Sequence, residues 1–258
     1  TTLNSYSLRL CMEECDMKRI IASEAIKLKK SGTLRLVLII PFVTLFIAFL
    51  MGGIQIFSVF SIYWWETGFL FLLMSLLFLY DIKSEEQAGN FQNVKWKKLS
   101  WKIHLAKMLL IWLRGILASI VLIILLYLVA FVFQGIVVVD FMKVSVALIA
   151  ILLAASWNLP FIYLIFKWIN TYVLLAANTL ICLIVAPFVA QTPVWFLLPY
   201  TYHYKVTESL LNIKPSGDLL TGKINFSIWE VLLPFGLSIV VTIGVSYLLK
   251  GVIEHDKK

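Results

Sequence analysis

The sequence predicts an all-α membrane protein with six transmembrane helices. The chain has 258 residues, 61% of them hydrophobic and 14% charged, and its mean hydropathy is +0.94. Soluble domains are about 45–50% apolar and about 25% charged, so a soluble core could not hide this much apolar surface. A helix needs about 20 mostly apolar residues to cross a bilayer. Six windows meet this requirement: residues 34–54, 62–80, 104–133, 144–166, 168–190 and 228–249.

The N-terminal part divides into a leader and a surface helix. Residues 1–16 match neither a signal peptide nor a transit peptide, and a more typical protein start begins at Met17. We therefore expect 1–16 to be a non-native or disordered leader and 17–258 to form one transmembrane domain. Residues 18–30 place Ile21, Ala25 and Leu28 on one helical face, which predicts an interfacial helix on the inner leaflet.

The basic residues orient the six spans. Eighteen of the 22 Lys and Arg residues lie on the side of the N-terminus, and only Lys143, Lys205, Lys214 and Lys223 lie on the other side. Basic residues stay cytoplasmic, which predicts that both termini are cytoplasmic. This topology and anionic lipid head groups account for the net charge of +8, so we expect membrane lipids and no nucleic acid as partners.

Tryptophans are expected at both membrane boundaries, as in an aromatic belt. The outer set is Trp64, Trp65, Trp195 and Trp229, and the inner set is Trp96, Trp101 and Trp168.

The long connection 191–227 is too apolar and aromatic for a free loop, and Pro193 and Pro199 divide it. We expect short external helices there, with Trp195, Tyr200 and Tyr202 in a region for packing or for cargo release.

Polar residues within spans are candidates for function or packing. Asn158 precedes Pro160 and is expected to cap the carbonyls that the proline frees. Asn178 is expected to bond to another helix. Arg114 is expected to reach toward the inner surface. Glu66 and Glu230 are expected at outer helix N-termini, where the helix dipole favours them.

The connection between the second and third windows is unusually charged. Nine charged residues fall between positions 81 and 107. Their cost at mid-bilayer would be about 20–30 kcal/mol, so this segment lies outside the lipid. Ser84 and Gln87 form a capping box that predicts a helix start, with Glu85 and Glu86 in its first turn.

A break and an apolar ridge follow this capping box. Gly89-Asn90 permits a bend, and Phe91 and Val94 form the ridge ahead of a lysine-rich stretch. This order of acidic residues, a bend, an apolar ridge and basic residues suits a helix that docks to a soluble partner. The alternative is a solvated loop.

Two sequence blocks resemble a known family. They are E-x-A-G-N-F-Q-N at 86–93 and S-E-x-x-K at 23–27, and together they are similar to permease subunits of lantibiotic-immunity ABC transporters, within the ABC-2 type permeases. The resemblance covers about residues 17–250 in span number and order. The lysine-rich "VKWKKLSW" after the first block departs from the family pattern.

The resemblance implies a role for each block. It implies a connecting helix carrying Ser23, Glu24 and Lys27, and a cytoplasmic coupling helix that contacts the ATPase. The coupling residues are Ser84, Glu85, Glu86, Gln87, Gly89, Asn90, Phe91, Gln92, Asn93 and Val94.

The same resemblance implies the assembly and the cargo. The chain is expected to be a transport subunit in a Gram-positive cell membrane, beside a second permease and an ABC ATPase that holds ATP and Mg²⁺. The cargo is expected to be a lantibiotic-type antimicrobial peptide. Two alternatives stay open: an ABC-2 permease for a drug or lipid-like cargo, and a stand-alone immunity protein that sequesters peptide.

Other chemical functions find little support. The G-x-x-x-x-G-K match at 217–223 is followed by Ile224 in place of the Ser or Thr that binds Mg²⁺. No metal-ligand spacing or nucleophile–base pair is evident, so we expect neither an enzyme nor a bound cofactor. Cys11, Cys15 and Cys182 give no disulfide framework.

Overall fold

The structure is a computed structural model that describes residues 17–29, 32–87, 100–220 and 228–255. It confirms the all-α class and six helices long and apolar enough to cross a membrane, so the chain is a multi-pass membrane protein. The spans, numbered one to six, are Thr33–Gly52, Phe57–Gln87, Trp101–Val132, Phe141–Ile165, Thr171–Ala190 and Ile228–Glu254.

Three of the spans are interrupted helices. Spans one, three and six are single helices: α2 (Thr33–Gly52), α6 (Ser100–Val132) and α12 (Ile228–His255). Span four consists of α7 (Phe141–Ala154) and α8 (Asn158–Ile165). Span two consists of α3 (Phe57–Trp64), the π-helical turn η1 (Trp65–Phe69) and α4 (Leu70–Gln87). Span five consists of α9 (Thr171–Leu180), the π-helical turn η2 (Ile181–Val185) and α10 (Ala186–Ala190).

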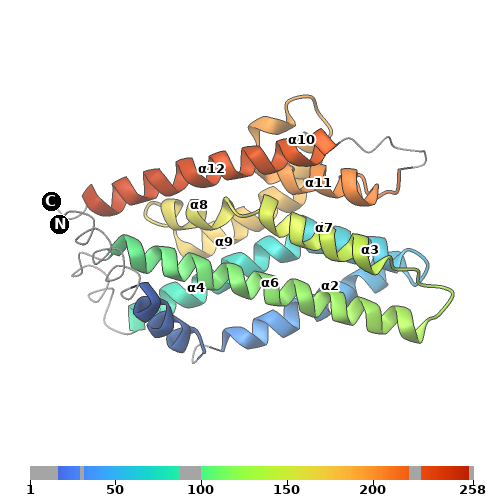
Figure 1. Ribbon diagram of the computed structural model, residues 1–258, viewed down its shortest axis with the longest axis horizontal. Helices are drawn as coiled ribbons and strands as arrows, with labels where there is room; N and C mark the ends of the chain where they lie inside the picture. The colour runs from blue at the N-terminus through green and yellow to red at the C-terminus, as the bar shows by residue number, and fades with distance from the viewer. Residues whose placement is uncertain (1–16, 30–31, 88–99, 221–227, 256–258) are drawn as a thin grey trace, which may run out of the picture.

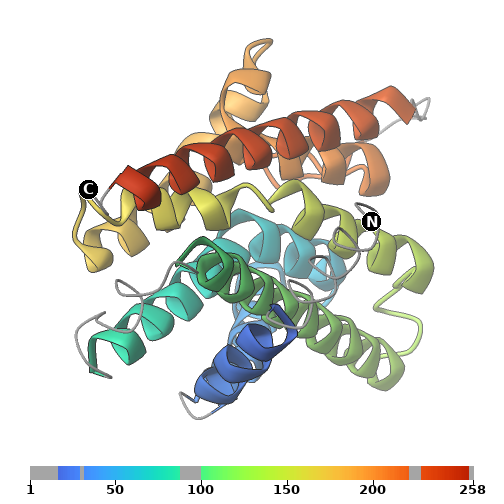
Figure 2. The same ribbon diagram turned by 60° about the vertical axis from the view of Figure 1, so that its left-hand side comes forward.

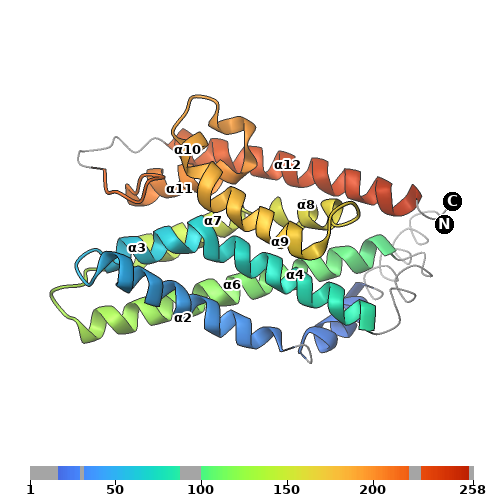
Figure 3. The same ribbon diagram turned by 180° about the vertical axis from the view of Figure 1, so that it is seen from behind.

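The spans run alternately along one bundle (Figure 1). We call the end with residues 17–29, Gln87 and the C-terminal end of α12 the proximal end, and the other the distal end (Figure 1). Figure 2 shows the helix of residues 17–29 lying beside α6 at the proximal end. In Figure 3, α4 and α9 lie side by side, in agreement with their contacts.

Spans two and four form the centre of the bundle. In the most apolar 18-residue stretch of each span, the fraction buried is 72% for span two and 67% for span four, against 33% or less for the other four spans. Trp65 in span two and Trp157 in span four are fully buried against this core. The prediction that Trp65 lies in a boundary belt is therefore wrong, because its ring faces protein on all sides. Trp229 is exposed at the start of α12, as a boundary residue would be.

Span four breaks just before Pro160, which lacks an N–H and disfavours a continuous helix. The carbonyls at the break are satisfied by span six, because Ser238 Oγ donates to the oxygens of Ala154 at 2.9 Å and Leu153 at 3.3 Å. The predicted capping role of Asn158 is therefore wrong. Its amide instead donates to Asn178 Oδ1 at 2.7 Å, which confirms the predicted inter-helix bond of Asn178.

The distal connection between spans five and six folds into short helices, as predicted. These are η3 (Trp195–Leu197), η4 (Pro199–Thr201) and α11 (Tyr202–Leu211). The α11 helix packs against α7 and α12 rather than projecting from the bundle. Its buried face therefore joins the core and brings His203 and Thr207 against span two.

Candidate functional site

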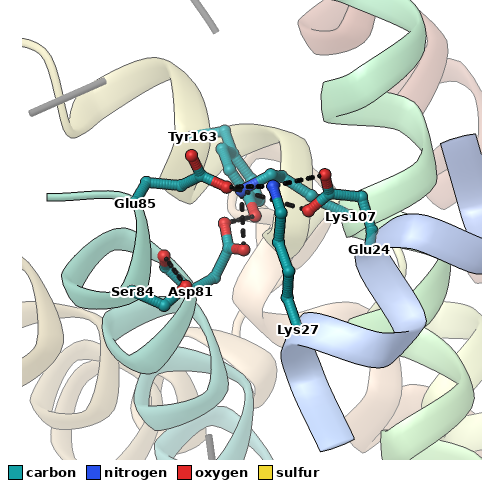
Figure 4. Close-up of polar contacts among 7 residues, drawn as sticks. All are labelled: Glu24, Lys27, Asp81, Ser84, Glu85, Lys107 and Tyr163. Carbon is teal, nitrogen blue, oxygen red and sulfur yellow. Dashed lines mark hydrogen bonds and ion pairs between the residues drawn. The ribbon is translucent and has the colours of Figure 1, made fainter. Parts of the chain in front are cut away.

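A buried cluster of charged side chains joins four helices at the proximal end (Figure 4). The helix of residues 17–29 supplies Glu24 and Lys27, α4 supplies Asp81 and Glu85, α6 supplies Lys107, and α8 supplies Tyr163. We call these six residues the proximal cluster. Local sequence explains two of the pairs, because Glu24 and Lys27 are three residues apart and Asp81 and Glu85 are four apart, so each pair shares a helix face.

Lys107 is the centre of the proximal cluster. Its Nζ lies 2.8 Å from Asp81 Oδ1, 3.0 Å from Glu85 Oε1 and 3.7 Å from Glu24 Oε2. The side chain of Lys107 is only 4% exposed, and the three carboxylates are equally buried. Each acid therefore depends on nearby donors rather than on water for its stabilisation.

Lys27 and Tyr163 complete the arrangement. Lys27 Nζ donates to Glu24 Oε1 at 2.8 Å and to Glu85 Oε1 at 2.9 Å, while Tyr163 donates to Asp81 Oδ2 at 2.9 Å. Partial burial lowers the pKa of Lys27, but hydrogen bonds to Glu24 and Glu85 outweigh it and leave that pKa raised. Three carboxylates and two ammonium groups give the cluster a formal net charge of −1.

The proximal cluster fastens the N-terminal helix to the bundle. The apolar face predicted for this helix turns toward the protein, where Leu28 is buried and its carbonyl accepts from Thr33 Oγ at 2.9 Å. Glu24 lies on the same face and reaches the cluster, whereas Ile26 is exposed. Any displacement of the N-terminal helix must therefore break ion pairs to span two and span three.

The predicted coupling segment begins in a different way from that expected. α4 runs without interruption from Leu70 to Gln87, so the predicted helix start at Ser84 is wrong. Ser84 Oγ donates to the carbonyl of Asp81 at 2.8 Å and does not cap a new helix. Glu85 is buried in the cluster, while Glu86 and Gln87 are exposed. The other predicted coupling residues, Gly89, Asn90, Phe91, Gln92, Asn93 and Val94, lie outside the described residues.

The predicted connecting residues Ser23, Glu24 and Lys27 fall within the helix of residues 17–29. Ser23 is exposed, whereas Glu24 and Lys27 both reach the cluster.

Sequence reasoning missed Asp81, Lys107 and Tyr163. A usable signal was present, because Asp81 and Lys107 are opposite charges within the ends of consecutive apolar spans, where an unpaired charge is costly. Consecutive spans meet at the same membrane surface, so these two charges were candidates for a pair. Tyr163 had no such signal, because a tyrosine near a span end is common in any membrane protein.

A second buried polar network lies nearer the middle of the bundle. Asn178 donates to Ser75 Oγ at 2.8 Å and accepts at Oδ1 from Asn158 at 2.7 Å and from Tyr200 at 2.6 Å. Burial raises the pKa of Tyr200, which keeps its hydroxyl protonated as a donor. These bonds link spans two, four and five to the distal connection.

The remaining predicted packing or cargo residues are distal. Tyr202 is buried and donates to the carbonyl of Phe196 at 2.9 Å, while Trp195 is half-buried against the ring of Tyr202. Tyr200 stacks edge-on with Trp157, with ring centroids 4.7 Å apart. These contacts give all three distal aromatics a packing role.

Comparison with protein-family models, curated proteins and solved structures finds no match to this chain. Within the described part of the chain, no group of three His, Cys, Asp or Glu residues is arranged to hold a metal ion. The fold and the proximal cluster define a six-span membrane protein whose N-terminal helix is ion-paired to its bundle.

Proposed function

We propose that this chain is the permease subunit of an ATP-driven ABC exporter, and that it expels a lantibiotic-type antimicrobial peptide from the membrane of a Gram-positive cell. The two family-like sequence blocks suggest the class. The observation that carries the proposal is the proximal cluster, which joins the S-E-x-x-K block to the helix that leads into the E-x-A-G-N-F-Q-N block.

This connection suits transmission of force from a soluble motor. Lys27 from the first block and Glu85, which immediately precedes the second block, are joined at 2.9 Å. An ATPase that grips the connection after Gln87 would move span two and the N-terminal helix together. Rigid-body movement of packed helices is an established form of switching. ATP and Mg²⁺ belong to the ATPase subunit in this scheme, and a related second permease completes the pathway.

The basic residues support an orientation with the proximal end in the cytoplasm. The helix of residues 17–29 and the C-terminal parts of α4 and α12 lie at the proximal end and carry Lys29, Lys83 and Lys250, whereas α11 and the start of α7 lie distally and carry Lys205 and Lys143 (Figure 1). This bias favours cytoplasmic termini. A cysteine introduced at Ser216, at the distal end, should label from outside in whole cells, and one at Lys97 should label only after permeabilisation. The reverse result would overturn the orientation.

The transport test reconstitutes this chain with a candidate ABC ATPase and a candidate second six-span permease. Cells carrying all three should retain less fluorescent lantibiotic than cells carrying any two. A catalytically inactive ATPase should abolish the difference. Protection that persists with the inactive ATPase would replace the exporter with a sequestering immunity protein. Release of a hydrophobic drug or lipid, but not of peptide, would assign a different cargo.

The docking test uses Gly89→Pro combined with Phe91→Asp and measures co-purification with the ATPase. We expect loss of the ATPase from the complex, because the proposed apolar contact becomes charged. Lys95→Gln, in the lysine-rich stretch that follows the block, is the control and should leave assembly intact. Normal assembly and normal peptide resistance in the double variant would reject the docking role.

A further inference from the structure

Two π-helical turns meet in the distal half of the bundle. η1 in span two and η2 in span five contact each other. At Gly68 an added Cβ would lie 3.7 Å from Leu183, so the two turns approach closely there. π-turns are rare and occur frequently at functional sites.

Four polar side chains are enclosed where these turns meet α11. Glu66 comes from η1, Cys182 from η2, and His203 and Thr207 from α11, and none of the four has any exposed surface. Thr207 Oγ donates to Glu66 Oε2, and Cys182 Sγ lies 3.6 Å from the carbonyl oxygen of Glu66 and 3.7 Å from His203 Nε2. The predicted placement of Glu66 at an outer helix N-terminus is therefore wrong, since it lies inside a span and inside the core.

The hydrogen-bonding capacity of this group is incomplete. Glu66 Oε1 and His203 Nδ1 are both buried and have no hydrogen-bond partner among the residues that the structure describes. Among the described residues, no Lys or Arg lies within ion-pair distance of Glu66. Buried acids elsewhere in the chain behave differently, because Asp81 and Glu85 each have a lysine at 3.0 Å or less.

The described residues around Glu66 supply no positive charge within ion-pair distance. Burial lowers the pKa of His203 to about 3, so its imidazole is neutral at physiological pH. The other titratable neighbours are Tyr63, Cys182 and Tyr204, which are uncharged when protonated.

The further helices packed on η1 add no charge nearby. In α2 and α9 the only titratable residues are Arg35 and Tyr172, each in the first turn at the proximal end. The titratable residues of α4 all lie between Tyr80 and Glu86, near its proximal end. On α11, Lys205 is ion-paired to Glu208 at 2.8 Å. An ionised carboxylate at Glu66 would thus be a buried charge with one hydroxyl as donor, an arrangement that costs several kcal/mol or more.

We propose that Glu66 is a proton-binding site, and that it holds one proton as a neutral carboxylic acid between the two π-turns. The ligand is the proton itself. The neutral carboxyl group keeps its hydrogen bond to Thr207 Oγ through Oε2. Buried acids at membrane depth commonly mark proton sites in membrane proteins. The proton stabilises the packed arrangement of the turns, and a movement that opens Glu66 to water releases it. This inference is independent of the proposed export function.

Infrared spectroscopy of the full chain in lipid bilayers at pH 7 tests the proposal. A protonated carboxyl group absorbs apart from ionised carboxylates and from the amide band. We expect such a band in the wild type, with a shift to lower frequency in D₂O and complete loss in Glu66→Gln. Glu230→Gln is the matched control, because Glu230 is exposed in the first turn of α12, and it should keep the band.

A second variant keeps the test decisive if Glu66→Gln fails to fold. Thr207→Val removes the hydroxyl donor but retains the shape of the side chain, so the protonated-carboxyl band should move to higher frequency. Absence of a protonated-carboxyl band in the wild type would overturn the proposal. A band that neither Glu66→Gln nor Thr207→Val alters would also overturn it, because the proton would then belong to another acid.

Discussion

Replacing Lys107 with methionine should destabilise the protein more than any other single loss of charge in the proximal cluster. Lys107 Nζ is 2.8 Å from Asp81 and 3.0 Å from Glu85, and its side chain is 4% exposed. Removing one partner from a buried ion pair costs about 3–5 kcal/mol. Since Lys27 and Tyr163 continue to donate to the acids, we expect about 3 kcal/mol, or a change on the order of 100-fold in the unfolding equilibrium.

A buried thiol provides the assay for this change. Cys182 is fully buried, so a thiol-reactive fluorophore reports its exposure on unfolding in mixed micelles. The chain has three cysteines, and replacing Cys11 and Cys15 with serine leaves Cys182 as the single reporter. The unfolding free energy then follows from the denaturant dependence of labelling.

Two further variants separate the effect of burying the lysine from the effect of its charge. Lys27→Met removes the same charge from a side chain that is 40% exposed, and it should cost about 1 kcal/mol or less. Combining Lys107→Met with Asp81→Asn returns the cluster to a net charge of −1 and should recover part of the loss. Equal destabilisation by the two lysine variants would refute the argument, because the central lysine would then contribute no more than a surface ion pair.

Three other substitutions test different parts of the core. Burial lowers the pKa of His203 to about 3, so the contribution of its neutral imidazole to stability is complete above pH 6.5 and falls as the pH decreases toward 3. A pH series of denaturant titrations should show the free energy of unfolding decreasing by up to about 1.4 kcal/mol per pH unit in this window. The His203→Gln variant should show a smaller decrease. Asn178→Leu should cost about 1–3 kcal/mol in the same assay, because several buried partners lose their bonds. Gly115→Val should cost about 1–3 kcal/mol, since a Cβ would lie 2.9 Å from Met74 Cε, whereas Gly244→Val, facing open space, should cost less in a parallel thermal melt.

The six spans were predictable because the constraint that defines them is local. Bilayer thickness fixes the length of an apolar run, so each span can be found without knowledge of the others. The structure extends span two from the predicted end at residue 80 to Gln87. The sequence obscured this extension because Asp81 and Glu85 are charged, and their pairing with Lys107, Lys27 and Tyr163 allows the helix to continue into the buried core.

The buried polar contacts were much less predictable, because they depend on which helices become neighbours. Glu66 looked like a residue at a helix start, yet the helix begins at Phe57 and the acid is enclosed by α11. Asn158 looked like a partner for the carbonyls near Pro160, yet Ser238 from span six takes that position. The local sequence indicates that a buried polar group needs a hydrogen-bond partner, whereas the packing of the helices determines which polar residue is that partner.

Span two connects the buried polar groups of the molecule along one helix axis. Asp81 and Glu85 lie in the proximal cluster, Ser75 bonds to span five near the middle, and Glu66 lies in the π-turn in the distal half of the bundle. With a rise of 1.5 Å per residue, Ser75 and Gln87 are separated by about 18 Å of continuous α-helix. A displacement at Gln87 therefore moves the cluster and the mid-bundle bond together, because the hydrogen-bonded helix between them is stiff. The π-turn interrupts that regular bonding, so it is the point along span two where a change of direction is most easily absorbed. The continuous helix α4 thus ends distally at the π-turn that contains Glu66, the acid whose neutrality depends on the turns remaining packed.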